Sequence, residues 1–186
     1  MMVKVCGITR REDALVAAEA GASAIGFIFY PQSPRYIAPE RAAALGKGLD
    51  LWKVGIFVDE APAAIETVMR AAHLDVAQIY GDGGPAGARV WKAVRVTDSF
   101  EWLGYNAEAL FLDSAKNGLS FDWNLARNAA EKVIIAGGLD ASNVAAAIDA
   151  AKPWGVDASS KLESAPGIKN HEKVRAFVKA ALEATW

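Results

Sequence analysis

Short hydrophobic runs alternate along the chain with segments in which hydrophobic residues recur every three or four positions. The runs are hydrophobic at consecutive positions, which is typical of strands that are buried on both faces of a parallel sheet. The recurrence every three or four positions is typical of helices with one buried face. The eight runs lie at residues 3–6, 24–30, 53–58, 76–80, 90–96, 109–112, 133–136 and 154–156.

The segments between the runs carry signals for the ends of helices. Thr9 and Glu12 predict a capping box at the start of the first helix, and Gly21 predicts its C-terminal cap. Pro39 predicts the start of the second helix, and Asn170 predicts the N-cap of the last one.

Further along the chain, Asp98 and Glu101 predict another capping box, and with it a helix after the fifth run. Three more helices are expected to bury one face each, because their hydrophobic residues keep helical spacing. The buried stripes are Ile65, Val68, Met69 and Ala72, then Val144, Ala147, Ile148 and Ala151, then Val174, Phe177, Val178, Ala181 and Leu182.

Eight successive units of strand and helix predict a closed (β/α)₈ barrel, the TIM-barrel fold, formed by residues 1–186 as a single domain. That fold typically takes about 250 residues, so this barrel is expected to be compact. Its fourth helix is expected to be abbreviated, because residues 81–89 are too few and too rich in glycine for a full crossover helix. An open, doubly wound parallel sheet is the structural alternative.

The composition narrows the class of protein. The 186 residues are 53% hydrophobic and 23% charged, which supplies a full core and excludes a disordered or collagen-like chain. The net charge is −2 and no basic run is present, which argues against nucleic acid or an anionic membrane as the main partner. The longest hydrophobic stretch, 24–30, is far shorter than the roughly 20 residues of a membrane span. We therefore expect a cytoplasmic protein whose partner is a small molecule or another protein.

The residues that bind metals well are scarce. Cys6 is the only cysteine, which excludes an intramolecular disulfide and a zinc site with several cysteines. The two histidines, His73 and His171, lie far apart in the sequence. A metal centre would therefore have to consist almost wholly of carboxylates, and we expect none.

Candidate catalytic residues follow the hydrophobic runs, because barrel enzymes place their active sites at the C-terminal ends of the strands. Neither histidine lies at such a position, so acid or base catalysis by histidine is not expected. The residues that do are Cys6, Arg35, Asp59, Asp82, Asp98, Asp113, Asp140 and Asp157, together with Gly137, Gly138, Ser159 and Ser160.

Several of these residues have a structural interpretation beside a functional one. Cys6 is either a small buried hydrophobic residue or, as a thiolate of lowered pKa, a base. Asp113 follows a hydrophobic run with no obvious helix behind it, where a carboxylate is costly unless it is paired or solvated in a cavity. Arg35 is either a surface residue or a planar cation for a carboxylate or phosphate.

The remaining aspartates and the glycine turn also leave two interpretations open. Asp98 and Asp140 are explained as helix caps, whereas Asp59 and Asp157 serve either turn geometry or a site. Gly137 and its neighbour Gly138 form either an ordinary turn or, with residues 157–160 after the eighth run, a phosphate site made of backbone amides.

Six motifs that extend over the whole chain resemble the phosphoribosylanthranilate isomerase family of tryptophan biosynthesis. They are KVCGIT at 4–9, GFIFYPQSPRY at 26–36, VGIFV at 54–58, FDW at 121–123, AGGL at 136–139 and GVDASS at 155–160, the last followed by Glu163, Ser164, Pro166 and Gly167.

The resemblance implies an Amadori rearrangement of N-(5-phosphoribosyl)anthranilate, a phosphorylated small molecule, with no cofactor and no metal. It implies that Cys6 is the general base at ribose C2, and that Asp113 is the general acid at the furanose ring oxygen. Arg35 would hold the anthranilate carboxylate. The phosphate would be held by the amides around Gly137, Gly138, Ser159 and Ser160 in the turns after the last two strands, and Asp157 is expected to be a further substrate-binding residue.

The chain departs from the family pattern at three places. The family usually has a Gly-Gly-Thr-Gly-type stretch where this chain has residues 114–120, and Gln-Leu-His-Gly where it has Gln-Ile-Tyr-Gly at 78–81. Asp59 stands where the family usually has Asn. We expect these changes to affect the geometry around the ribose and the rate more than the class of reaction.

Two alternative functions remain at this point. One is a related barrel isomerase that acts on the ribonucleotide of histidine biosynthesis, although such enzymes use two aspartates and Cys6 stands at one of those positions. The other is an inactive barrel that serves as a binding protein, although both Cys6 and Asp113 are present. A monomer and a homodimer are equally compatible with the sequence.

Overall fold

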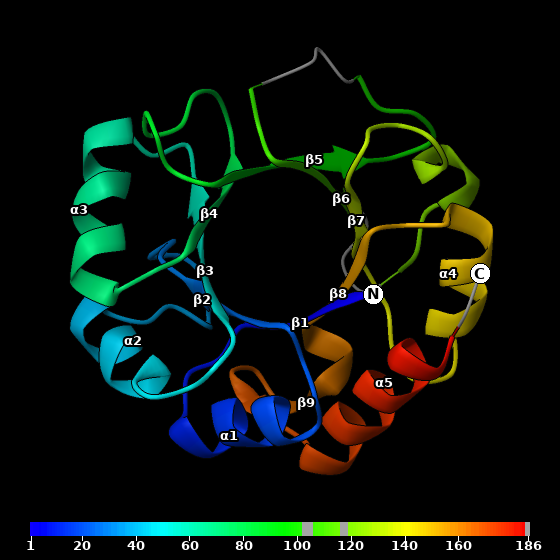
Figure 1. Cartoon of the computed structure of the whole chain (residues 1–186), viewed down its shortest axis with the longest axis horizontal. Helices are drawn as coiled ribbons and strands as arrows, with labels where there is room; N and C mark the ends of the chain where they lie inside the picture. Colours follow the sequence, from blue (N-terminus) through cyan, green and yellow to red (C-terminus); the bar gives the residue numbers. More distant parts are fainter. Residues whose placement is uncertain (102–105, 116–118, 185–186) are drawn as a thin grey trace.

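The computed structural model of the chain describes residues 1–101, 106–115 and 119–184, and it contains a closed barrel of eight parallel strands. Each strand pairs with the next, and the last pairs with the first, so the barrel closes between Met2 and Gly155 (Figure 1). The predicted TIM barrel is therefore confirmed, and the open sheet is excluded. The strands are β1 (Met2–Cys6), β2 (Ala24–Ile28), β3 (Trp52–Val58), β4 (Val76–Tyr80), β5 (Val90–Val96), β6 (Ala109–Ser114), β7 (Val133–Ile135) and β8 (Gly155–Ala158).

The helices lie around the outside of the barrel (Figure 1). A short 3₁₀ helix, η1, follows β6, and a second one, η2, lies after β8 before a small antiparallel hairpin. The bounds are α1 (Arg11–Glu19), α2 (Pro39–Gly46), α3 (Pro62–Ala72), η1 (Trp123–Ala126), α4 (Val144–Ala151), η2 (Ser160–Leu162), β9 (Glu163–Ala165), β10 (Ile168–Lys169) and α5 (His171–Glu183).

The connections between β4 and β6 contain no helix in the residues that are described. Residues 81–89 are all described and form turns and bends, so the predicted abbreviation of the fourth helix is confirmed. The helix predicted at Asp98 and Glu101 falls partly on residues 102–105, which lie outside the described residues, and 97–101 are not helical. The altered stretch 114–120 likewise includes residues 116–118, outside the described part.

Most of the predicted helix ends are confirmed, but the first capping box is wrong. The helix α1 begins after Arg10 and has no side-chain cap, because the hydroxyl group of Thr9 donates to the carbonyl oxygen of Gly167 instead. Gly21 follows the end of α1 with a φ of +93°, which a glycine adopts without strain. The Oδ1 of Asn170 accepts a hydrogen bond from the backbone amide of Lys173 at the start of α5, as expected.

The helices pack on the barrel through the predicted stripes. The four stripe residues of α4 are all buried. In α5, Val174, Phe177, Val178 and Ala181 are buried, whereas Leu182 is exposed. In α3, Ile65 and Ala72 are buried, and the other two stripe residues are half-buried.

The interior of the barrel is closed at the N-terminal end of the strands by aromatic side chains. Trp91 is fully buried there, and its ring centroid lies 6.0 Å from that of Trp154 and 6.2 Å from that of Trp52. Smaller inward-facing residues such as Val54 and Ala109 complete this layer. This end is filled, whereas a cavity opens at the carboxyl ends of the strands.

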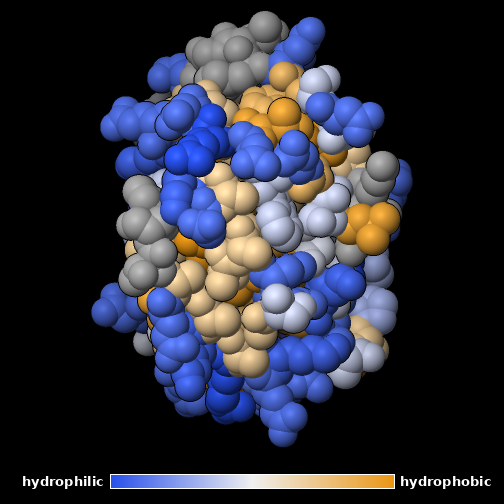
Figure 2. Space-filling model, turned by 90° about the vertical axis from the view of Figure 1, so that its right-hand side faces the viewer, coloured by the Kyte–Doolittle hydropathy of each residue, from blue (hydrophilic) through white to orange (hydrophobic). Residues whose placement is uncertain are grey.

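Polar and charged side chains cover much of the face that is seen from the right-hand side of Figure 1, and hydrophobic areas lie between them (Figure 2). No helix in the described part of the chain is both long and apolar enough to cross a membrane.

Candidate functional site

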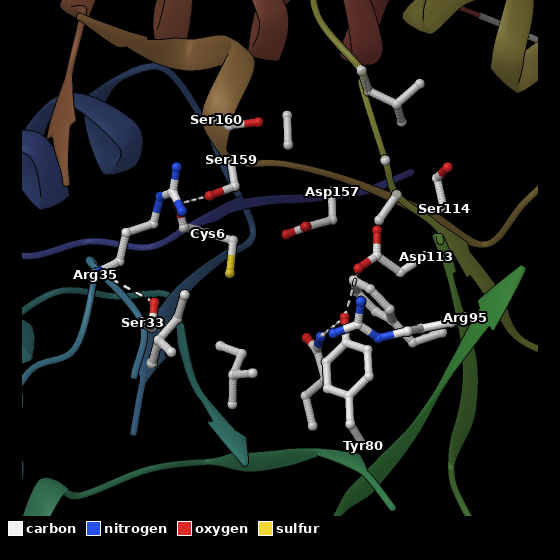
Figure 3. Close-up of a pocket in the computed structure, with 18 of the residues that line it drawn as sticks. Cys6, Ser33, Arg35, Tyr80, Arg95, Asp113, Ser114, Asp157, Ser159 and Ser160 are labelled. Carbon is white, nitrogen blue, oxygen red and sulfur yellow. Dashed lines mark hydrogen bonds between the residues drawn. The ribbon is translucent and has the colours of Figure 1, made fainter. Parts of the chain in front are cut away.

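A cavity of about 580 Å³ opens at the carboxyl ends of the strands, and it brings together candidate residues that lie far apart in the sequence (Figure 3). Successive residues of a strand point to opposite faces, so each strand contributes alternate residues to the interior. The predicted site residues that line the cavity are Cys6, Arg35, Asp113, Gly137, Gly138, Asp157, Ser159 and Ser160.

The other four predicted positions do not line this cavity. Asp59 and Asp82 are exposed, and Asp98 lines a smaller neighbouring cavity of about 300 Å³. Asp140 shapes the turn before α4, where its Oδ1 accepts a hydrogen bond of 2.8 Å from the backbone amide of Ser142. The N-cap position of α4 is Asn143, so Asp140 supports the start of that helix from outside it.

Cys6 is buried at the end of β1, one inward position beyond Lys4. The ammonium group of Lys4 is fully buried, and its Nζ lies 2.7 Å from Oδ1 of Asp157 on β8. Burial raises the pKa of the Cys6 thiol, and the positive charge of Lys4 and a hydrogen bond from it oppose that rise. The site therefore holds a protonated thiol beside a cation that stabilises its ionised form.

Gly26 on β2 makes room for these two side chains. A Cβ atom at this position would lie 2.8 Å from Sγ of Cys6 and 3.1 Å from Cε of Lys4. Any larger residue would have to displace the thiol, the lysine stem or both. The glycine in the motif at 26–36 therefore has a packing reason next to the candidate base.

Asp113 lies across the cavity from Cys6, near the end of β6 (Figure 3). Its Oδ2 accepts a hydrogen bond of 2.9 Å from Oη of Tyr80. Burial raises the pKa of the Asp113 carboxyl group, and the hydrogen bond from Tyr80 acts against that rise. A carboxyl group of raised pKa is suited to deliver a proton.

Arg35 contributes its guanidinium group to the cavity, but part of that group is already engaged. Its Nε and Nη2 donate to the two carboxylate oxygens of Glu163, both at 2.7 Å. Glu163 also accepts from Nζ of Lys169 at 2.9 Å. Burial raises the pKa of Glu163, but these two cations outweigh burial and the net shift is downward. Arg35 is thus fixed at the cavity wall and is not a free surface residue.

The turns after β7 and β8 also line the cavity. Gly137 and Gly138 have φ values of +92° and +68°. A Cβ atom at Gly137 would lie 2.5 Å from Cβ of Ser114, so only glycine fits there. Ser159 donates to the carbonyl oxygen of Cys6 at 3.1 Å and so connects this turn to the end of β1. Lys161 adds a positive charge to the same wall.

The sequence analysis assigns no role to several polar residues that the structure places at or beside the cavity: Lys4, Tyr80, Arg95, Glu163 and Lys169. Lys4, Tyr80 and Arg95 occupy the inward-facing set of their strands, and strict alternation along each strand could have found them. Lys169 reaches Glu163 from the hairpin after β8, which no local pattern indicates. Among the described residues, no three histidine, cysteine or acidic side chains gather as metal ligands.

Residues 3–180 match the family model described as N-(5'phosphoribosyl)anthranilate (PRA) isomerase. The N-(5'-phosphoribosyl)anthranilate isomerase of Solibacter usitatus is 52% identical over 198 residues, which cover 99% of this chain and 98% of that protein. The similarity therefore extends over nearly the whole of both sequences.

Two solved structures resemble the barrel closely. The crystal structure of phosphoribosyl anthranilate isomerase from Thermus thermophilus has a TM-score of 0.92 at 36% identity and covers 100% of both chains. Another phosphoribosyl anthranilate isomerase, in complex with reduced 1-(o-carboxyphenylamino)-1-deoxyribulose 5-phosphate, has a TM-score of 0.86 at 37% identity and covers 98% of both chains.

Proposed function

The chain belongs to the N-(5'-phosphoribosyl)anthranilate isomerase family, and we propose that Cys6 and Asp113 perform the reaction of that family as general base and general acid. The protein is an isomerase of tryptophan biosynthesis that converts N-(5-phosphoribosyl)anthranilate to 1-(2-carboxyphenylamino)-1-deoxyribulose 5-phosphate. The observation that supports these roles best is that a buried thiol and a carboxyl group of raised pKa face one cavity from opposite sides (Figure 3).

The proposed reaction opens the sugar ring first. Asp113 gives its proton to the furanose ring oxygen, the bond from that oxygen to C1 breaks, and the lone pair of the anthranilate nitrogen forms the C=N bond of a protonated Schiff base. The thiolate of Cys6 then removes the proton at C2, and the electrons of that C–H bond move toward nitrogen to give an enolamine. Transfer of a proton to C1 and loss of the C2 hydroxyl proton yield the ketone, so atoms and electrons balance without an oxidant or reductant.

Each group has to adopt its less stable protonation state, and part of its surroundings favours that state, although for Cys6 burial outweighs this and the net pKa shift is upward. Cys6 has to be ionised, and the Lys4 ammonium group beside it favours the thiolate. Asp113 has to be protonated, and its burial together with the negative charge of Asp157 favours the neutral acid. Proton transfer of this kind contributes on the order of 10² to 10⁴ to a rate.

Arg35 is proposed to bind the anthranilate carboxylate through one edge of its guanidinium group. A guanidinium group has five N–H donors, and Glu163 uses one on Nε and one on Nη2. The edge formed by Nη1 and the second hydrogen of Nη2 can still accept a carboxylate in bidentate geometry. Glu163 therefore orients this edge and does not compete for it.

The phosphate group is proposed to lie at the turns of Gly137–Gly138 and Ser159–Ser160, with Lys161 nearby. The glycines let the backbone approach an anion closely. Asp157, a carboxylate, would repel the phosphate. We therefore propose that the carboxylate of Asp157 accepts a hydrogen bond from a hydroxyl group of the sugar.

We also propose that residues 1–186 act as a single domain in the cytoplasm on a phosphorylated small molecule, without cofactor, metal, nucleic acid or membrane, as a monomer or homodimer. Sedimentation at several protein concentrations would distinguish the two states. The alternative function, isomerisation of the ribonucleotide of histidine biosynthesis, is not proposed, because the family match and Cys6 both favour the anthranilate substrate.

The assay that tests the function uses freshly made phosphoribosylanthranilate and follows the loss of anthranilate fluorescence. We expect turnover that chelators leave unchanged. Binding of the reduced product analogue without any turnover would instead indicate an inactive barrel that has kept its site. Chelator-sensitive activity that metal restores would contradict the absence of a metal.

A further inference from the structure

Tyr80 is the last residue of β4, and its hydroxyl group lies against the carboxylate of Asp113 on β6. The hydrogen bond from Oη to Oδ2 measures 2.9 Å and is visible in Figure 3. The strands β4 and β6 are not neighbours, since β5 lies between them. The contact therefore passes across the interior of the barrel at the cavity wall.

We propose that Tyr80 is a positioning residue for the general acid: its hydroxyl group fixes the Asp113 carboxyl group so that Oδ1 delivers the proton. The proposal rests on the role of Asp113 proposed above. Tyr80 has one hydroxyl hydrogen, and Oδ2 of Asp113 accepts it. Oδ1 has no hydrogen-bond partner among the residues that the structure describes, so the acidic proton is left for Oδ1.

The tyrosine ring is itself held in place from two sides. The guanidinium carbon of Arg95 on β5 lies 5.6 Å from the centroid of the ring. The Nε2 of Gln78, two residues earlier on β4, lies 3.5 Å from Oη of Tyr80 at the same wall. Because these two contacts already restrict the side chain of Tyr80, it loses little conformational freedom when its hydroxyl group donates to Asp113. The hydrogen bond therefore favours one orientation of the Asp113 carboxyl group.

Four charged or titratable groups surround Asp113 from four strands. Tyr80 on β4, Arg95 on β5 and Lys4 on β1 favour the carboxylate, whereas Asp157 on β8 and the burial of the group favour the neutral acid. Only Tyr80 forms a direct hydrogen bond with it in the described structure. When Asp113 gives up its proton, this hydrogen bond stabilises the carboxylate that remains.

The test compares Tyr80→Phe with the unsubstituted protein, because phenylalanine keeps the ring and removes only the hydroxyl group. The titration of the Asp113 carboxyl carbon is followed by ¹³C NMR, without substrate. We expect the pKa of Asp113 to rise by about one to two pH units. The matched control is Tyr36→Phe, the same change at an exposed tyrosine outside the cavity, which should leave the titration of Asp113 unchanged.

Kinetics supply the readout for orientation. At the pH optimum of each protein, Tyr80→Phe should lower kcat by about ten- to a hundredfold with little change in KM, since it misplaces the acid and leaves the binding groups in place. An unchanged pKa of Asp113 in folded Tyr80→Phe would overturn the proposal. If the unsubstituted protein has no turnover but Tyr80→Phe still raises the pKa of Asp113, the proposed function is contradicted, whereas the hydrogen bond between Tyr80 and Asp113 is established.

A measurement on the unsubstituted protein keeps the proposal testable if Tyr80→Phe does not fold. The ¹³Cζ resonance of Tyr80 should shift over the pH range in which Asp113 titrates, because the hydrogen bond changes strength when its acceptor is protonated. No shift of that resonance over this range would show that the two groups are not joined in solution.

Discussion

Lys4 and Asp157 form an ion pair inside the barrel, where Nζ of Lys4 lies 2.7 Å from Oδ1 of Asp157. The two residues are paired in register across β1 and β8, the strands between which the barrel closes. Burial alone would lower the pKa of Lys4, but the carboxylate outweighs it and the net shift is upward. The same ammonium group acts on the thiol of Cys6, so one buried cation serves both the closure of the fold and the candidate base.

Replacing Lys4 by methionine should show separately what Lys4 contributes to the stability of the fold and to the pKa of Cys6. Removal of one partner leaves the buried Asp157 carboxylate unpaired, which typically costs about 3 to 5 kcal/mol of stability. The double variant Lys4→Met with Asp157→Asn should recover part of that loss in urea unfolding. In both variants the pKa of Cys6 should be higher than in the unsubstituted protein, as measured by thiolate absorbance. An unchanged thiol pKa would show that Lys4 does not act on the base.

Cys6→Ala should remove the general base and keep the fold. We expect kcat to fall on the order of 10² to 10⁴, while the unfolding transition changes little because only the sulfur atom is lost. Cys6→Ser is the matched variant: a hydroxyl group fills the same space but ionises far less readily, so it should be nearly as inactive. Near-normal turnover in either variant would show that Cys6 is not the base and is only a small hydrophobic residue of the core.

The barrel could be predicted from the sequence because hydrophobic periodicity is a local property. All eight runs became strands whose ends agree with the prediction within two residues. The exception at Thr9 is instructive: its hydroxyl group takes a partner 158 residues away, at Gly167, in preference to the first turn of its own helix. A local pattern cannot show such a competing partner.

The site could be predicted in part for the same reason. Barrel enzymes place their active sites at the carboxyl ends of the strands, so position and the family resemblance predict Cys6 and Asp113 as site residues, and both line the cavity. The pairing of Arg35 with Glu163 was not, because these residues lie 128 positions apart and meet only in the folded chain. Tyr80 was noted as a departure from the family, but its hydrogen bond to Asp113 depends on the curvature of the closed barrel.

Asp113→Asn should remove the general acid without a change of shape. Because the proposed mechanism needs a protonated Asp113 and an ionised Cys6, kcat/KM of the unsubstituted enzyme should follow a bell-shaped pH profile. The limb that belongs to Asp113 should be missing from the residual activity of the variant, and kcat should fall about as far as in Cys6→Ala. A flat profile of the unsubstituted enzyme, with chemistry shown to limit the rate, would contradict the pair.

Asp13 should make stability depend on pH in the acid range. This carboxylate is buried and accepts hydrogen bonds from Arg10, from the backbone amide of Lys169 and from His171, so it joins α1 to the start of α5. Burial raises the pKa of Asp13, but these hydrogen bonds outweigh burial and the folded-state pKa lies below the ordinary 3.8. A group whose pKa is lowered on folding stabilises the protein above its unfolded pKa, and the stabilisation is lost as the pH falls through the folded pKa.

Asp13→Asn should therefore cost about 2 kcal/mol in urea unfolding at pH 7, and the difference from the unsubstituted protein should shrink as the pH is lowered below 3.8. Asp149→Asn is the control, because Asp149 is exposed and its ion pair with Lys152 lies at the surface. A difference that stays constant between pH 7 and acid would show that the charge of Asp13 does not carry the effect.

Arg35 and Glu163 should behave as one unit in substrate binding. Glu163→Gln keeps the size of the side chain but removes the charge that holds Nε and Nη2 of Arg35, so the guanidinium edge meant for the substrate loses its orientation. We expect KM and the dissociation constant of the reduced product analogue to rise about tenfold, with a smaller change in kcat. Arg35→Lys keeps the charge but not the planar donors, so it should raise both constants at least as much. If the two residues act as a unit, the double variant should bind the product analogue no more weakly than Arg35→Lys alone. If the losses of binding free energy in the two single variants instead add up in the double variant, Glu163 takes no part in recognition of the carboxylate and has only a structural role in the hairpin after β8.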